Sequence, residues 1–219
     1  MRKMFKVAIS ILAVLVGISL LVSPTEASFW AKVMRFHYWP DYGDLGDGLD
    51  KAAPRYETPR KLESGTGAAF SAGYDFSDNW GVRLDTFGFI GVADYHHLHL
   101  VDTFLFEAST SPILLSVVYR VPSRGKLHPY LGAGMGSFPS ELTITSNIHE
   151  GAHYTDSPIG FQVLAGGELR LGDGLFFSSE LRYLSAKAEY PGYYRCIESP
   201  STDWSGLFVS IGLGYSFGL

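Results

Sequence analysis

The sequence contains a single cysteine, Cys196, in 219 residues. An internal disulfide framework is therefore excluded, and a thiol this far from the amino terminus cannot be the anchor of a lipoprotein. Beyond residue 27, no run approaches the roughly 18 consecutive apolar residues that a transmembrane helix requires. Basic residues are outnumbered, with 17 Lys and Arg against 22 Asp and Glu. A chain with this charge balance is a poor candidate for nucleic-acid binding.

Residues 1–27 have the composition of a secretory signal peptide. Three basic side chains precede an apolar stretch over residues 7–22, and Thr25 and Ala27 provide the small residues that a signal peptidase reads. We therefore predict cleavage before Ser28, with an uncleaved membrane anchor as the alternative. Cleavage removes three basic residues and one acidic residue. The mature domain, residues 28–219, then carries 14 basic and 21 acidic residues, a net charge of −7.

Strict alternation of apolar with small or polar residues is clearest in residues 206–217. Such a strand places one face against an apolar environment and the other against a polar one. About eight segments share this alternation. They are residues 29–39, 65–76, 80–92, 111–121, 128–138, 158–171, 175–190 and 206–217. Repetition after a secretory signal predicts an all-β protein, an eight-stranded antiparallel up-and-down transmembrane β-barrel whose apolar face meets lipid.

The connections between these segments alternate between long and short. The short turns are residues 77–79, 122–126 and 172–174, and the long loops are residues 40–63, 93–108, 139–157 and 191–203. In residues 93–108, extensions of the flanking strands are the alternative to a loop. In outer membrane barrels the short turns face the periplasm and the long loops face outward. Aromatic residues near the short turns predict an interfacial girdle. These aromatics are Tyr74, Trp80, Tyr119, Phe176 and Tyr215.

Charged residues share the parity of the small, inward-facing residues. The predicted lumen charges are Arg35, Arg83, Asp85, Arg120, Glu168, Arg170, Glu180 and Arg182. In residues 29–39 this assignment points Arg35 and His37 inward and Met34, Phe36 and Tyr38 outward. Because an eight-stranded barrel is only about as wide as its side chains, charges confined there must pair. The pattern favours a salt-bridged plug. A narrow polar conduit or gate is the functional alternative, and a catalytic pair is the remaining one.

Three histidines, His96, His97 and His99, form the most conspicuous short motif. His97 and His99 would lie on one side of an extended chain, but zinc usually takes three or four ligands, so solvated loop residues are the favoured interpretation. A lipid-modifying barrel enzyme would need a serine within reach of a histidine base, and no His-x-Ser occurs. Cys196 lies in a loop with no fixed base beside it. We therefore expect no catalytic, metal or cofactor site.

Two glycine-aromatic motifs resemble strands of small outer membrane β-barrels, nearest to the outer membrane protein W and opacity-type families. The motifs are residues 129–136, PYLGAGMG, and residues 212–217, GLGYSF. The resemblance implies that Tyr215 and Phe217 are the signal read by the barrel-assembly machinery, although Gly218 and Leu219 follow them. It also implies limited passage of small, including hydrophobic, solutes.

The competing interpretation is a non-transporting barrel that serves membrane integrity or binds surfaces or partners through its loops. The expected partners are outer membrane lipids and the assembly machinery, with no nucleic acid, and a monomer is favoured. The expected location is the outer membrane.

Overall fold

The computed structural model describes residues 28–52, 62–96, 103–147, 151–190, 193–194, 197–198 and 201–218. The predicted signal peptide, His97, His99 and Cys196 lie outside the described residues. The elements are β1 (Ser28–Pro40), α2 (Gly43–Ala52), β2 (Gly65–Asp75), β3 (Trp80–Phe87), β4 (Phe89–His96), β5 (Thr103–Thr110), β6 (Ile113–Arg120), β7 (Leu127–Ser137), β8 (Ser140–Ser146), β9 (Ala152–Asp156), β10 (Ile159–Arg170), β11 (Leu175–Ser185), β12 (Lys187–Glu189), β13 (Tyr193–Tyr194), β14 (Ile197–Glu198), β15 (Ser201–Asp203) and β16 (Gly206–Gly218).

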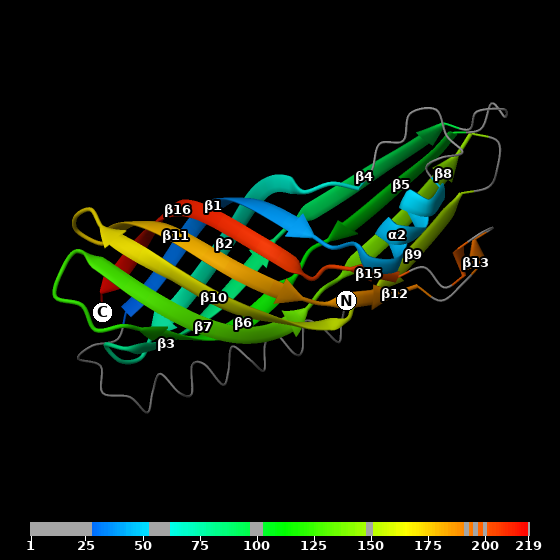
Figure 1. Ribbon diagram of the computed structural model, residues 1–219. Helices are drawn as coiled ribbons and strands as arrows, with labels where there is room; N and C mark the ends of the chain where they lie inside the picture. The colour runs from blue at the N-terminus through cyan, green and yellow to red at the C-terminus, as the bar shows by residue number, and fades with distance from the viewer. Residues whose placement is uncertain are drawn as a thin grey trace.

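Eight antiparallel strands close into a barrel in the order β1-β16-β11-β10-β7-β6-β3-β2, as the sequence predicts (Figure 1). The first and last strands pair along their whole length, from Ser28 opposite Gly218 to Pro40 opposite Gly206, and this pairing completes the closure. Three short connections join β2 to β3, β6 to β7 and β10 to β11 at one end, which we term the turn end. The opposite end, which carries the remaining elements, is the sheet end.

The outer wall of the barrel is apolar. In β16, for example, Leu207, Val209, Ile211 and Leu213 are 37–54 % exposed, while Phe208 and Ser210 of the other parity are buried. The sequence predicts the same outward residues in this strand, and a wall that faces lipid must be apolar.

An aromatic girdle lines the turn end of this wall on the adjacent strands β16, β1, β2, β3 and β6. The ring centroids lie 4.7 Å apart for Phe29 and Tyr74, and 4.9 Å apart for Trp80 and Tyr119. Tyr215 and Phe217 also pack at 4.9 Å. Phe176 was predicted to belong to the girdle but points inward instead, because its position in β11 has the lumen parity.

A second sheet, in the order β4-β5-β8-β9, extends beyond the barrel at the sheet end (Figure 1). Its strands continue the chain direction of barrel strands, but each is separated from its barrel strand by a break. The breaks contain Gly88, Pro112, Pro139 and Pro158. Proline lacks the N–H that a hydrogen-bonded ladder needs, so three of these breaks have a direct cause in the sequence.

Two predicted loops are wrong in their interior, because residues 139–157 are largely strand and residues 40–63 contain the helix α2. In residues 93–108 the strands β4 and β5 match the predicted strand extensions. The short ladders β12–β15 and β13–β14 lie within the region predicted as the end of the seventh strand and the last loop. Among the described residues, no helix is long and apolar enough to cross a membrane.

Candidate functional site

The interior of the barrel is divided along its axis. Charged side chains fill the middle and the turn end, and apolar side chains fill the sheet end. We term the first set the charge network. Its members are four cations and four carboxylates, namely Lys32, Arg83, Arg120, Arg182, Asp75, Asp85, Glu168 and Glu180. Equal numbers of opposite charges let the buried set remain neutral as a whole, which limits the cost of enclosing it.

Arg83 lies at the centre of the charge network and is 1 % exposed. Its Nε donates to both carboxylate oxygens of Asp85, at 3.0 and 2.9 Å. Its Nη1 and Nη2 donate to Glu180, at 2.5 and 3.2 Å. The planar guanidinium thus bridges carboxylates from its own strand, β3, and from β11 across the lumen.

Arg182 of β11 joins Arg83, Asp85 and Glu180, and we term these four residues the central cluster. Its Nε donates to Glu180, and its Nη2 lies 3.3 Å from Oδ1 of Asp85. The guanidinium also lies 4.9 Å from the ring centroid of Phe208, which is one of the apolar side chains that fill the sheet end. Gln162 donates from Nε2 to Asp85 at 2.9 Å, and the hydroxyl of Ser71 donates at 2.5 Å, so Asp85 is bound from four strands.

Lys32 reaches the same cluster from β1 and is fully buried. Its ammonium donates to the hydroxyls of Tyr130 at 3.0 Å and Ser178 at 3.2 Å, and it lies 3.4 Å from Glu180 and 3.9 Å from Glu168. The Tyr130 hydroxyl in turn donates to Glu180 at 2.6 Å. A carboxylate that accepts from four different side chains is held in a single position.

The turn end of the lumen contains a cavity of about 330 Å³. Arg120 pairs with Asp75 there, and its Nε lies 3.7 Å from Glu168. Trp30 and Phe176 form aromatic walls. The central cluster lies between this cavity and the apolar interior, so the two are separated by ion pairs.

Most of the predicted lumen charges lie where parity placed them. Arg83, Asp85, Glu168, Glu180 and Arg182 are buried inside the barrel, and Arg120 is largely enclosed. Arg170 has the inward parity but is exposed at the end of β10, where it lines the turn-end cavity. The pairing partners are mostly across the lumen rather than between β10 and β11, because side chains this long span a narrow bore.

The prediction for Arg35 is wrong. In β1 the buried positions are Trp30, Lys32, Met34, Phe36 and Tyr38, and Arg35 and His37 lie on the opposite, outward face. The physical reason is the hydrogen-bonded register of β1 with its two neighbouring strands, since paired residues point to the same face. Arg35 pairs with Ala68 of β2 and Ile211 of β16, both of which face outward.

Lys32 is the functional side chain that sequence reasoning missed. Both faces of β1 carry one formal charge and several aromatic residues, so alternation alone does not choose between them. The available signal was the position of Phe29 and Trp39 at the two ends of one face, where girdle residues are expected.

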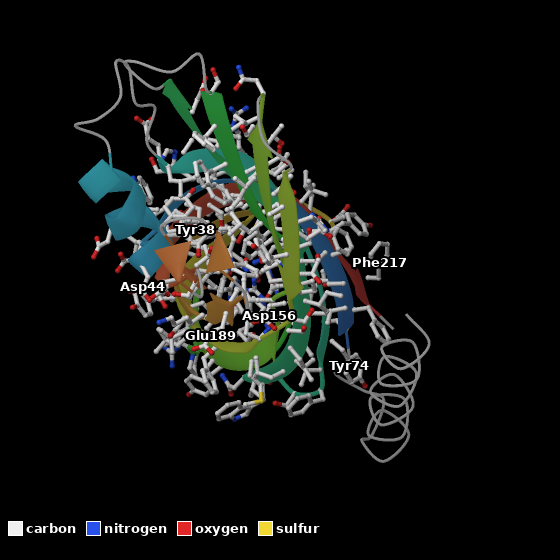
Figure 2. All side chains as sticks on the ribbon, turned by 90° about the vertical axis from the view of Figure 1, so that its right-hand side faces the viewer. Tyr38, Asp44, Tyr74, Asp156, Glu189 and Phe217 are labelled. Carbon is white, nitrogen blue, oxygen red and sulfur yellow. The ribbon has the colours of Figure 1, made fainter. Side chains whose placement is uncertain are left out.

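The apolar layer fills the sheet end of the barrel. The rings of Phe36 and Phe208 stack with centroids 4.5 Å apart, and Phe87 lies 5.0 Å from Phe208. Figure 2 shows Tyr38 among the side chains that fill this interior, whereas Phe217 projects from the outer wall. The same buried cluster continues into the second sheet through Phe104, Phe106, Leu142 and Ile144.

Tyr42 closes part of the apolar layer beyond the end of β1. Its hydroxyl donates to the backbone carbonyl of Glu63 at 2.9 Å, and its ring lies 5.9 Å from that of Trp204. Burial raises the pKa of the Tyr42 phenol, which therefore remains a neutral hydrogen-bond donor at neutral pH.

The two residues of the predicted assembly signal lie together at the turn end. Tyr215 and Phe217 both face outward, at 45 % and 54 % exposed. Among the described residues, no group of three or more His, Cys, Asp or Glu side chains is arranged to hold a metal ion. The side chain of His96 lies outside the described part of the chain, as do His97 and His99.

Comparison with known proteins identifies the family. Residues 10–217 match the outer membrane protein beta-barrel domain. The chain is 24 % identical over 210 residues to PahQ of Pseudomonas aeruginosa and to DoxH of Pseudomonas sp. (strain C18), covering 90 % of this chain and 93 % of each relative. The crystal structure of OprG from Pseudomonas aeruginosa has the same fold, with a TM-score of 0.54 and 18 % identity over 89 % of this chain and 98 % of OprG. The apolar wall, the girdle and the family match all agree with an outer membrane location, and the chain belongs to the outer membrane protein β-barrel family.

Proposed function

We propose that this barrel is a narrow, passive conduit for small hydrophobic solutes, particularly flat aromatic ones, and that it is not an enzyme. The observation that carries the proposal is the apolar layer. It joins the inner face of the second sheet, at Phe104 and Ile144, to the barrel interior at Phe87 and Phe208 in one buried cluster. These side chains pack against one another, so a hydrophobic solute would enter by displacing them and would stay in apolar surroundings as it does so.

The charge network closes the bore next to the apolar layer, so the proposed conduit is confined to the apolar layer. Ion pairs fill the bore below the apolar layer, so a wide aqueous path is absent from the described lumen. We therefore propose that currents of small ions are weak. The buried carboxylates are engaged with arginine or lysine, which supports a structural role for them rather than acid–base chemistry.

The names of two relatives support the proposed solute class. PahQ and DoxH are both called dibenzothiophene metabolism operon proteins. Dibenzothiophene is an apolar polycyclic aromatic compound, and aromatic faces such as those of Phe36 and Phe208 favour stacked or edge-on contact with such rings.

Uptake by intact cells tests the proposal. Initial uptake of labelled dibenzothiophene at low concentration is compared between cells with and without the protein. Phe87→Asn introduces a polar amide among the rings, and Phe87→Leu is the matched control that keeps the site apolar. We expect faster uptake with wild type and Phe87→Leu than with Phe87→Asn. Equal uptake with and without the protein would contradict the conduit and would favour a role in membrane integrity or surface binding.

Two further features belong to the same proposal. We propose that the barrel acts as a monomer and that Tyr215 and Phe217 engage the barrel-assembly machinery. Their side chains are exposed and lie in the last strand. The assembly machinery can therefore contact them before this strand pairs with β1 and closes the barrel. Replacing both with alanine is expected to slow assembly in cells, measured as the fraction of protein that resists unfolding in unheated SDS.

A further inference from the structure

The outer wall of the eight barrel strands carries one formal charge. In these strands, all of which are described, Arg35 is the only Asp, Glu, Lys or Arg side chain with the outward parity. His37 lies two residues farther toward the sheet end on the same face, and Thr66 of β2 is paired with His37. We term Arg35, His37 and Thr66 the polar stripe. It interrupts a wall that is otherwise made of apolar, small and hydroxyl side chains.

The polar stripe lies in the half of the membrane that faces the cell exterior. Short turns mark the periplasmic side of such barrels, so the sheet end is external. Six residue steps separate Arg35 from Phe29 in the girdle. At about 3.3 Å per residue and a tilt of about 40°, Arg35 is about 15 Å above that girdle, in an apolar band about 25 Å tall. Trp39, which is 45 % exposed, follows near the external boundary.

No neighbouring side chain on the wall can neutralise Arg35. Its ladder partners are Ala68 and Ile211, and neither offers an anion. A guanidinium left in hydrocarbon is strongly unfavourable, and long basic side chains avoid this by extending toward the interface. The small side chain of Ala68 leaves room beside β1 for that extension. The charge then needs an anion at the level of the lipid headgroups.

We propose that Arg35 anchors one phosphorylated lipid of the outer leaflet, with its guanidinium on the phosphate and His37 beside it. Phosphate suits arginine because two parallel N–H donors match two oxygens. The acyl chains lie along the apolar wall over Ile211 and Val33, which are 53 % and 60 % exposed. The site is thus a lipid site on the outside of the barrel and is independent of the proposed conduit.

Native mass spectrometry of the full-length mature protein in detergent tests the site. The probe is lipid A with its phosphates, and the comparison lipid is the same molecule after enzymatic removal of the phosphates. The variants are Arg35→Gln, Arg35→Lys and Arg124→Gln. Arg124 is an exposed cation in the short turn between β6 and β7, so its replacement is the matched control. A heat-dependent shift in SDS checks that each variant is folded.

We expect Arg35→Gln to bind phosphorylated lipid A about tenfold more weakly than wild type, and Arg124→Gln to bind as wild type does. Arg35→Lys should be intermediate, since it keeps the charge but loses the paired donors. Dephosphorylated lipid A should bind wild type weakly. This comparison uses only the wild-type protein, so a folding defect in a variant cannot affect it. Equal binding of the two lipids, or equal binding by Arg35→Gln, would overturn the proposal. Competition by inorganic phosphate alone would also overturn it, because it would indicate a free-anion site.

Discussion

Replacing Glu180 with glutamine tests whether the charge network holds the barrel together. Glu180 is 2 % exposed and contacts Arg83 at 2.5 Å, Tyr130 at 2.6 Å and Lys32 at 3.4 Å, in addition to Arg182. Glutamine keeps the length and one acceptor but removes the charge. The network would then contain four cations and three carboxylates, with three of the cations beside the neutral amide.

The expected loss of folding free energy is about 3–5 kcal/mol, the cost of breaking a buried ion pair by removing one partner. The lower end of this range is favoured because the amide oxygen still accepts a hydrogen bond. Adding Lys32→Met restores equal numbers of charges. Since Glu168 keeps Arg120 at 3.7 Å, the double variant should recover about 1–2 kcal/mol, which is within the usual coupling energy of neighbouring sites.

Urea unfolding in lipid bilayers and single-channel recording provide the two measurements. The control is Glu141→Gln, an exposed carboxylate in β8, which should change stability by less than about 0.5 kcal/mol. We expect small wild-type currents and larger or noisier ones for Glu180→Gln. If Glu180→Gln unfolds and conducts as wild type does, or if wild type conducts like a wide porin, the lumen is not closed by paired charges.

Three other predictions follow from parity, packing and the amino terminus. Ile211→Arg, which places a charge on the apolar wall, should cost roughly 2–4 kcal/mol of folding into bilayers, measured by urea titration; normal folding would reverse the inside–outside assignment. Gly134→Ala should destabilise the barrel in the same titration, because the added Cβ would overlap the Ser116 side chain and the Leu115 carbonyl. An unchanged midpoint would mean that these neighbours can move. The intact mass of the membrane-extracted protein should correspond to a chain beginning at Ser28, and a mass that includes residues 1–27 would show that the signal peptide is retained.

The sequence was sufficient for the barrel and for the orientation of seven strands. Alternation has a period of two, and a strand between lipid and a narrow lumen has one environment on each face. In β16 and β11 the two faces differ strongly, so Ile211 and Glu180 could be assigned without a structure. In β1 they do not differ, because Arg35 and Lys32 lie on opposite faces and each face carries aromatic residues. Only the hydrogen-bonded register with β2 and β16 decides that strand.

The partners inside the lumen could be named only from the tertiary structure. Arg83 and Glu180 are 97 positions apart in the chain, and their contact depends on the shear of the closed barrel, which local sequence does not encode. The second sheet is a related case. Pro112, Pro139 and Pro158 indicated where ladders end, but not that strands resume beyond them. Alternation is a local property of the sequence, and it determined which way the side chains point. The division of the lumen into a charged part and an aromatic part arose only when strands distant in sequence closed around one axis.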